Sequence, residues 1–165
     1  MKRFFVLGLI SLVACSDSST STTGTGTGTG TGSGTGTDPG TTGSTDSSAQ
    51  QACVDAINAY RKTVGSPALT RWNAEESCTD GQAKSDSTSK PHGAFGQCME
   101  MAQDECPGWP GPADANMVTS CLKAMWAEGP GGGHYENMKN AQYTQVSCGF
   151  YTSSAGKVWA VQNFK

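Results

Sequence analysis

The two histidines of this chain are the residues with the clearest capacity for chemistry. His92 precedes Glu100 by eight residues, and His134 follows Glu128 by six residues across a run of glycines. Imidazole binds metal ions and exchanges protons near neutral pH. Both histidines lie in glycine-flanked segments, where loop side chains are commonly positioned for binding. His92, His134, Glu100 and Glu128 are therefore candidates for a functional site, and the spacing alone leaves open whether they form one site.

Two imidazoles with one or two carboxylates form a mixed nitrogen and oxygen ligand set of the kind that Zn²⁺ accepts. These ligand types do not separate zinc from another divalent cation. Because protonated imidazole does not bind metal, the affinity should fall at acidic pH. In a metal-dependent hydrolase, Glu100 or Glu128 would act as general base on the metal-bound water. The alternative for either histidine alone is a structural residue held by hydrogen bonds.

Other routes to catalysis have little support in the sequence. No Ser-His-Asp order with a nucleophile elbow is visible, and the thiols are expected to be oxidised. The glycines at 131–133 are interpreted as a turn, because the Lys-Ser/Thr that completes a phosphate-binding loop is absent. Tyr135 is a candidate for the wall of a cleft, whereas Trp126 continues an apolar helical stripe and is expected in the core.

The elements that must position these residues follow from the periodicity of apolar side chains. Helices are predicted over 48–64, over 73–85 and around 118–126, and a short helical segment follows His134. The alternating segments 144–150 and 158–164, joined by a turn, predict a β-hairpin. Helices followed by an antiparallel hairpin favour an α+β layered domain.

The middle of the domain is less regular. A short strand is predicted within Phe95–Ala102. The segment Cys106–Pro112 contains three prolines and two glycines, so we expect irregular chain there without ladder pairing.

Residues 1–14 read as a signal peptide, because Lys2 and Arg3 precede an apolar run that is too short to span a bilayer. Leu12-Val13-Ala14-Cys15 resembles the bacterial lipoprotein box, which implies cleavage before Cys15 and its lipidation. An ordinary signal peptide with an incidental Cys15 is the alternative. Since Ser16 follows in place of the usual retention aspartate, we expect the outer membrane in a Gram-negative host.

Residues 15–48 form a predicted linker of Thr, Gly and Ser without aliphatic or aromatic side chains after Cys15. Such a chain cannot bury enough surface to fold, and we expect a tether with a reach of roughly 30 Å. An O-glycosylated stalk or wall-spanning spacer is physically similar. The folded domain is predicted at 49–165.

Charge and cysteine content limit the partners and the compartment. The net charge of −3 becomes −5 once Lys2 and Arg3 are removed, and no basic cluster remains, so nucleic acid is not an expected partner. Beyond Cys15 the exported domain has an even set of cysteines, without the C-x₂-C pairs of zinc sites, and a three-disulfide framework is predicted. The connectivity stays open, although Cys98 and Cys106 are close enough in sequence for a local loop. The six cysteines are Cys53, Cys78, Cys98, Cys106, Cys121 and Cys148.

Several motifs in order resemble the CAP superfamily (cysteine-rich secretory proteins, antigen 5 and pathogenesis-related 1, also called SCP domains), in particular its bacterial branch. The matching segments cover nearly the whole predicted domain. They are Ala59-Tyr60-Arg61 with Gly65-Ser66-Pro67-Ala68-Leu69, a second helix over 74–83, His92 before Glu100, Trp126 with Glu128, Gly133-His134-Tyr135, Asn137-Met138, and Tyr143-Thr144-Gln145-Val146.

The chain departs from the family pattern in two places. Met99 and Met101 replace the Gly and Asn that flank the family's glutamate, taken here as Glu100. Trp126 and Glu128 are two positions apart where three is usual.

The resemblance implies a three-layer α-β-α sandwich, stabilised here by disulfides, in which His92, His134, Glu100 and Glu128 line one surface cleft. It implies a surface-tethered module that binds a metal, a lipid, a peptide or an envelope partner more than an enzyme. A metal-dependent hydrolase and a purely structural envelope protein are the alternatives.

Overall fold

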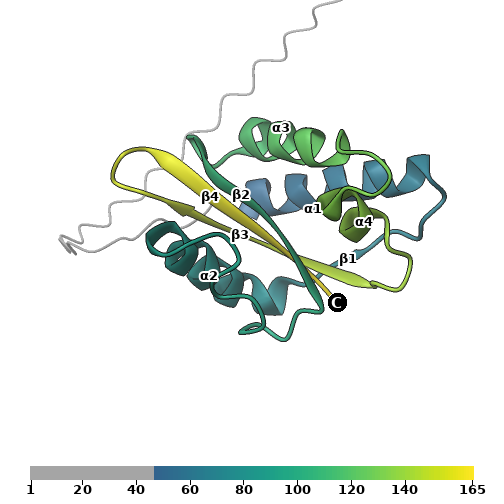
Figure 1. Ribbon diagram of the computed structural model, residues 1–165, viewed down its shortest axis with the longest axis horizontal. Helices are drawn as coiled ribbons and strands as arrows, with labels where there is room; N and C mark the ends of the chain where they lie inside the picture. The colour runs from purple at the N-terminus through teal and green to yellow at the C-terminus, as the bar shows by residue number, and fades with distance from the viewer. Residues whose placement is uncertain (1–46) are drawn as a thin grey trace, which may run out of the picture. The chain divides into compact units, whose positions relative to one another are not determined.

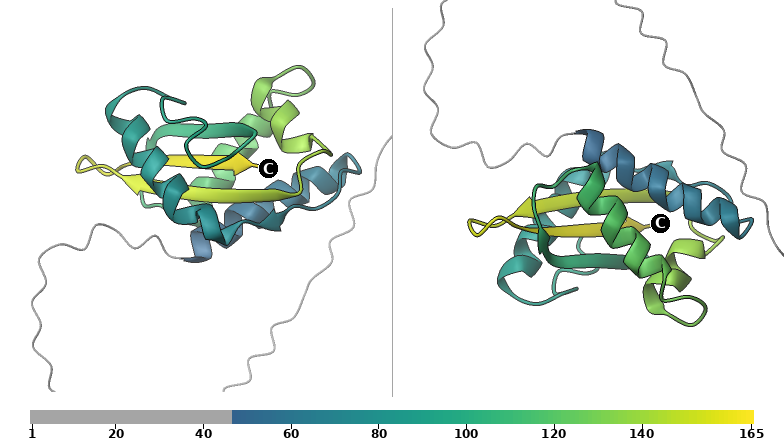
Figure 2. Two further views of the ribbon diagram at one scale, coloured as in Figure 1. Left: turned by 90° about the horizontal axis from the view of Figure 1, so that it is seen from below. Right: turned by 90° about the horizontal axis from the view of Figure 1, so that it is seen from above.

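The computed structural model describes residues 47–165, and this part of the chain forms three layers (Figure 1). Helices α1 (Ser47–Thr63), α3 (Ala115–Trp126) and α4 (Gly133–Lys139) cover one face of a sheet, and α2 (Glu76–Thr88) covers the other face (Figure 2). The predicted α-β-α sandwich is confirmed. The predicted signal peptide, lipidation site and linker lie outside the described residues, apart from the last residues of the linker.

The sheet has the strand order β1-β3-β4-β2. Strand β3 (Gln145–Thr152) and strand β4 (Lys157–Phe164) form the predicted antiparallel hairpin, and β2 (Ala102–Pro110) pairs antiparallel with β4. The short β1 (Thr70–Arg71) lies parallel to β3, and a 3₁₀ turn at Asn73–Glu75 leads into α2. Strand β2 is therefore an edge strand beside the C-terminal strand.

Two predictions about the middle of the chain were wrong. Residues 89–101, called here the 89–101 loop, contain no strand, and β2 begins only at Ala102. The segment predicted to be irregular contributes Cys106 to Pro110 to β2, with a register shift between Cys106 and Trp109. Prolines are tolerated here because an edge strand has one side without a ladder partner, and because the bulge absorbs the irregular spacing.

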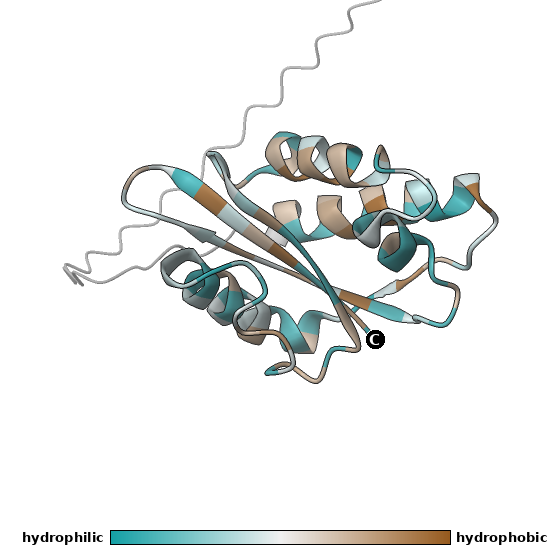
Figure 3. Ribbon diagram, viewed as in Figure 1, coloured by the Kyte–Doolittle hydropathy of each residue, from teal (hydrophilic) through white to brown (hydrophobic). Residues whose placement is uncertain are grey.

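The predicted apolar stripe of the third helix is confirmed as the centre of the core. Asp114 caps α3, since its carboxylate accepts a hydrogen bond from the Met117 amide at 2.8 Å. Val118 and Leu122 are fully buried and pack with α1 and the sheet. In Figure 3 the apolar colours accordingly gather on α3 and the central strands, while α2 is mostly polar.

All six cysteines of the described domain are paired, as predicted. The pairing differs from the local loop considered for Cys98 and Cys106, because α2 lies beside Cys98 and α3 lies beside Cys106. Each bond joins a helix to another element. The bonds are Cys53–Cys148, Cys78–Cys98 and Cys106–Cys121.

The C-terminal end of α4 is held by a buried arginine of α1. The Arg61 guanidinium donates hydrogen bonds to the carbonyl oxygens of Met138 at 2.8 Å and Asn140 at 2.9 Å. The Arg61 Nε also donates a hydrogen bond to the Pro67 carbonyl oxygen at 2.7 Å. Because a buried guanidinium needs such acceptors, this contact fixes the helix that carries His134. No helix within residues 47–165 is both long and apolar enough to cross a membrane.

Candidate functional site

His92 lies on the exposed 89–101 loop in a left-handed backbone conformation, with φ of 59°. Its amide donates to the Glu105 carboxylate of β2 at 2.7 Å. Its ring Nδ1 lies 2.9 Å from Oε1 of Gln103, also on β2. The edge strand therefore positions both the backbone and the ring of this histidine.

The hydrogen bonds beneath His92 determine which ring nitrogen carries the proton. Gln82 Nε2 donates to the Ala94 carbonyl at 2.8 Å, so Gln82 Oε1 must be an acceptor. Gln103 Nε2 donates to that Gln82 oxygen at 3.2 Å and to Asn163 Oδ1 at 3.1 Å. Gln103 Oε1 consequently faces His92, and the neutral ring donates from Nδ1. Its Nε2 then presents a lone pair.

Glu100 does not share this site with His92. Its carboxylate is buried and accepts from the Gly96 amide at 2.5 Å, the Cys98 amide at 2.8 Å and Gln82 Nε2 at 2.6 Å. These three donors hold the 89–101 loop in shape. The position beside the ring that the sequence suggested for Glu100 is occupied by Gln103, because the strand starts only after Glu100.

His134 and Glu128 contact each other. The His134 Nδ1 lies 2.5 Å from Glu128 Oε1, and the His134 amide donates to Oε2 at 3.2 Å. The hydrogen bond from His134 is the main cause that lowers the pKa of Glu128. A Cβ on Gly132 would lie 2.4 Å from the Glu128 Cβ, so only glycine allows this turn. The carboxylate therefore orients the ring through Nδ1.

Asp104 lies on β2 between Gln103 and Glu105, the two residues that contact His92. It is fully buried, and Asn137 of α4 donates to its Oδ1 at 2.8 Å. Burial is the largest cause that raises the pKa of Asp104 to about 7, against the lowering effects of Asn137 and His134. Its Oδ2 has no partner among the described residues. Asp104 therefore anchors α4 to the sheet at a cost in desolvation.

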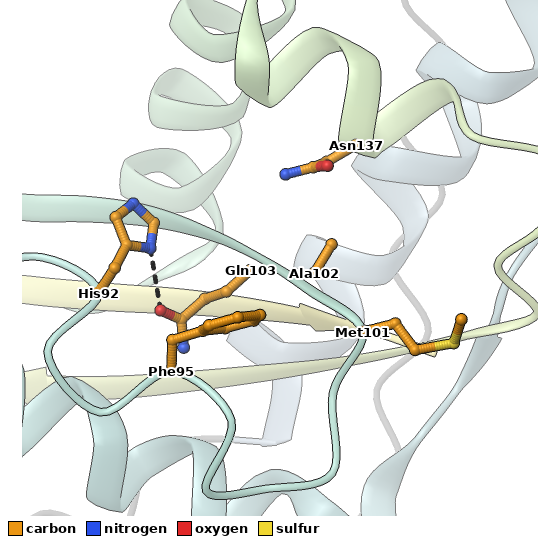
Figure 4. A pocket seen from close by; sticks show the side chains of 6 residues that line it. All are labelled: His92, Phe95, Met101, Ala102, Gln103 and Asn137. Atoms are coloured by element: carbon orange, nitrogen blue, oxygen red, sulfur yellow. Dashed lines mark hydrogen bonds between the residues drawn. The ribbon is translucent and has the colours of Figure 1, made fainter.

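A surface groove of about 370 Å³ opens beside His92 (Figure 4). Its lining comes from the 89–101 loop, β2 and α4, which places Asn137 across the groove from Phe95 and His92. The groove is lined by His92, Phe95, Met101, Ala102, Gln103 and Asn137.

The predicted four-residue site is thus divided. His92 faces the groove, whereas His134 pairs with Glu128 at the start of α4, one turn before Asn137. Tyr135 does not line the groove, since its ring packs on Trp126 with centroids 4.4 Å apart. Trp126 is partly buried against the core, as expected.

The side chains near the two histidines do not form a suitable ligand set for a metal ion. Both rings are oriented through Nδ1, which is how metal-binding histidines are commonly held. However, no three His, Cys, Asp or Glu side chains of residues 47–165 come together as a possible metal site. Protein zinc sites ordinarily take at least three protein ligands, so we derive no chemistry from a metal here.

The sequence did not single out Gln103 or Asp104 as functional residues. One signal was present, because Gln103-Asp104-Glu105 is a run of three polar residues directly before the half-cystine Cys106. A buried cysteine in a strand implies a buried strand, and polar residues in a buried strand require specific partners. Asn137 was noted only as part of a family motif.

The sequence model of the family described as "CAP: Cysteine-rich secretory protein family" matches residues 54–164. The chain belongs to this family. The match begins inside α1 and ends at the last residue of β4, so it covers all three layers. No curated protein sequence matches the chain.

Solved structures also match part of this chain. An extracellular protein with an SCP domain from Bacillus anthracis is 18% identical with a TM-score of 0.49, and the match covers 70% of this chain and 39% of that chain. A cysteine-rich secretory protein from Staphylococcus aureus is 12% identical with a TM-score of 0.47, covering 74% and 40%. This CAP chain therefore spans about two fifths of the length of either bacterial protein.

A parasite protein of this kind matches over more of its own length. The venom allergen-like protein 4 of Schistosoma mansoni is 12% identical with a TM-score of 0.48, and the match covers 70% of this CAP chain and 86% of that chain.

Proposed function

We propose that this CAP protein is an exported, envelope-tethered binding module that takes a small amphipathic ligand in the groove beside His92. The proposal rests on one observation, the groove of about 370 Å³ with an oriented His92 ring at one side and Phe95 and Met101 at another. Pockets of this size accept small molecules or single peptide side chains.

The polar lining defines the chemistry of the ligand. His92 Nε2 presents a lone pair in the neutral ring, because Nδ1 donates to Gln103. Asn137 donates its amide group to Asp104, which leaves Asn137 Oδ1 as an acceptor. No lysine or arginine lines the groove. The groove therefore suits a neutral ligand with hydroxyl or amide donors and an apolar portion, and not an anion.

Export and tethering are part of the same proposal. Three disulfides in a small domain are typical of an oxidising compartment outside the cytoplasm. The amino-terminal sequence supports a lipid on Cys15 followed by a tether, with the outer membrane as the destination in a Gram-negative host. Mass spectrometry of the mature protein tests this part, because the proposal requires that Cys15 is acylated.

A hydrolase is less well supported by the contacts. Glu100 is committed to three donors, and the Glu128 carboxylate is committed to His134. The cysteines of the described domain are all in disulfides, so no thiol nucleophile remains there. Binding without turnover is therefore the function we propose.

Ligand-observed NMR with matched probes tests the groove. Decanol and decanamide carry donors on an apolar chain, whereas decanoate carries an anionic acceptor of the same length. We expect the alcohol and the amide to bind more tightly than decanoate. His92→Ala should weaken that binding by about tenfold, the value of one lost hydrogen bond of 1.4 kcal/mol.

His134→Ala is the matched control, because it removes the other imidazole without touching the groove lining. Equal loss of binding in both histidine variants, or a preference for decanoate, would contradict the proposed site.

A further inference from the structure

The 89–101 loop exposes an unusual set of apolar side chains. Among the described residues, four large apolar side chains are exposed, and three of them lie on this loop. Met99 and Met101 are each 62% exposed and Phe95 is 50% exposed, while the fourth, Val64, lies near the C-terminal end of α1. A cluster of exposed large apolar side chains on one loop is the usual mark of an interaction surface.

The loop holds these side chains outward, because its backbone is tied to buried carboxylates. Four alternate amides of the loop donate inward, those of His92, Ala94, Gly96 and Cys98. Their acceptors are the carboxylates of Glu105, Asp86 and Glu100, at distances from 2.5 to 2.8 Å. The disulfide Cys78–Cys98 ties the same loop to α2. The apolar side chains are therefore presented by a fixed backbone.

Neither the backbone nor the core explains the methionine at position 99. Met99 has φ of 61°, a left-handed conformation that favours glycine. Its side chain is mostly exposed, so it gains little from packing. A residue that is disfavoured by its backbone and unused by the core points to a role in contact with something outside the domain.

Within residues 81–101 the exposed lysine, arginine, aspartate and glutamate side chains are all basic. Over residues 81–101 the two acidic side chains, Asp86 and Glu100, are buried beneath the loop. The two basic side chains, Lys84 and Lys90, are exposed. The surface of this stretch is therefore apolar and cationic, although the whole chain carries a net charge of −3.

We propose that the 89–101 loop docks onto an anionic lipid bilayer, with Phe95, Met99 and Met101 entering the interface and Lys90 meeting the headgroups. Apolar side chains together with lysines are what such a surface binds. The bilayer is the occupant that we infer because the proposed lipid on Cys15 and its tether, with a reach of roughly 30 Å, keep the domain next to one. This inference rests on the tethering part of the proposed function.

The test uses the mature chain with Cys15→Ser, so that no acyl chain contributes to binding. Vesicles of phosphatidylcholine with phosphatidylglycerol are compared with phosphatidylcholine alone in a sedimentation assay. We expect binding to the anionic vesicles only. Replacing Phe95, Met99 and Met101 together by serine should lower the partition coefficient by at least about tenfold, since three apolar side chains leave the interface.

Two further variants keep the result interpretable. Val64→Ser removes the fourth exposed large apolar side chain of residues 47–165 and should leave vesicle binding unchanged. Met99→Gly relieves the left-handed backbone, so it should fold at least as well as the parent while binding vesicles about threefold less. It should also keep groove binding, because Met99 does not line the groove.

Absence of binding to anionic vesicles, equal binding to neutral ones, or equal loss in Val64→Ser would overturn the proposal. Retention of vesicle binding by the serine triple variant would also overturn it. So would protection of the loop side chains by a protein partner and not by vesicles. An unmodified Cys15 in the wild-type protein would refute the tether alone, because vesicle binding by the Cys15→Ser chain is measured independently.

Discussion

Helices α3 and α2 cover opposite faces of one sheet with different kinds of side chain. The core on the side of α3 and α1 is mostly apolar or disulfide-bonded, with Val118 and Leu122 of α3 and the Cys53–Cys148 bond at its centre. The cross-strand pair Asp104 and Gln162 is buried on this face as well and is polar. Beneath α2 the cross-strand row Gln103, Asn163 and Ser147 is polar and buried. The two faces alternate along the same strands, because successive residues of a strand point to opposite sides.

The two faces contribute differently to the free energy of folding and to the positions of side chains. Apolar burial stabilises without direction, whereas a hydrogen-bond network fixes donors and acceptors. On the α2 face, Thr79 contacts Ser147 at 2.7 Å, and Asn163 Nδ2 donates to Gln82 Oε1 at 2.6 Å. A Cβ on Gly149 would lie 2.3 Å from the carbonyl carbon of Thr79, so glycine lets α2 approach closely. The polar face ends at His92 and the groove.

The largest expected effects concern the disulfides of the two faces. Cys53–Cys148 closes a 95-residue separation on the apolar face, and Cys78–Cys98 closes 20 residues on the polar face. In the chain-entropy model, replacing both cysteines by alanine should cost about 4.7 kcal/mol for the long loop and about 3.3 kcal/mol for the short loop. Urea unfolding of the two double variants measures this difference.

Loss of the short disulfide should also free the 89–101 loop, whereas loss of the long one should not. Faster amide exchange at 92–98 in Cys78→Ala/Cys98→Ala alone would support the comparison. The reverse order of stabilities, or the same loop exchange in both variants, would break it.

A pair of core substitutions separates stability from geometry. Leu122→Ala on the apolar face should cost about 2–5 kcal/mol through transfer and cavity terms. Gln82→Leu on the polar face should cost about 2–4 kcal/mol, since it leaves the Ala94 carbonyl and the Glu100 carboxylate without this buried donor. Thermal or urea unfolding gives both values.

Only Gln82→Leu should change the hydrogen bonding of His92. Gln82 orients Gln103, which holds His92 in the tautomer with a proton on Nδ1. The ¹⁵N shifts of the His92 ring should therefore report mixed tautomers in Gln82→Leu and a single tautomer in Leu122→Ala. Identical ring shifts in the two variants would show that the network does not set the tautomer.

The smallest expected effect concerns Asp104, which together with its cross-strand partner Gln162 is polar and buried on the otherwise apolar face. Burial raises its pKa from 3.8 to about 7, so the folded chain keeps a proton that the unfolded chain releases. The resulting stability is complete below the unfolded pKa and is lost as pH rises through 7. Between about pH 6 and pH 8, ionisation of Asp104 should lower the free energy of unfolding by about 1.4 kcal/mol, and Asp104→Asn should not show this decrease.

Glu105→Gln on the polar face is the matched variant, because burial also raises the pKa of Glu105 to about 7. Each substitution should flatten the pH dependence of the unfolding free energy. An unchanged slope in Asp104→Asn would mean that this carboxylate is already ionised in the fold near neutral pH.

Local patterns in the sequence determined much of the fold. The apolar stripe of α3, the alternation in the β3–β4 hairpin and the even set of six cysteines predicted elements that the structure contains. These signals are local, because helix and strand periodicities involve residues within a few positions of each other. The family motifs added the layered arrangement.

Only the tertiary structure decided which side chain meets His92. The sequence suggested Glu100, but the strand begins at Ala102, so Gln103 lies beside the ring and Glu100 turns inward to the loop amides. The cysteine partners and the place of Pro107 in an edge strand were decided in the same way. The physical reason is that register and helix docking are set by packing across the whole domain, which short-range patterns do not encode.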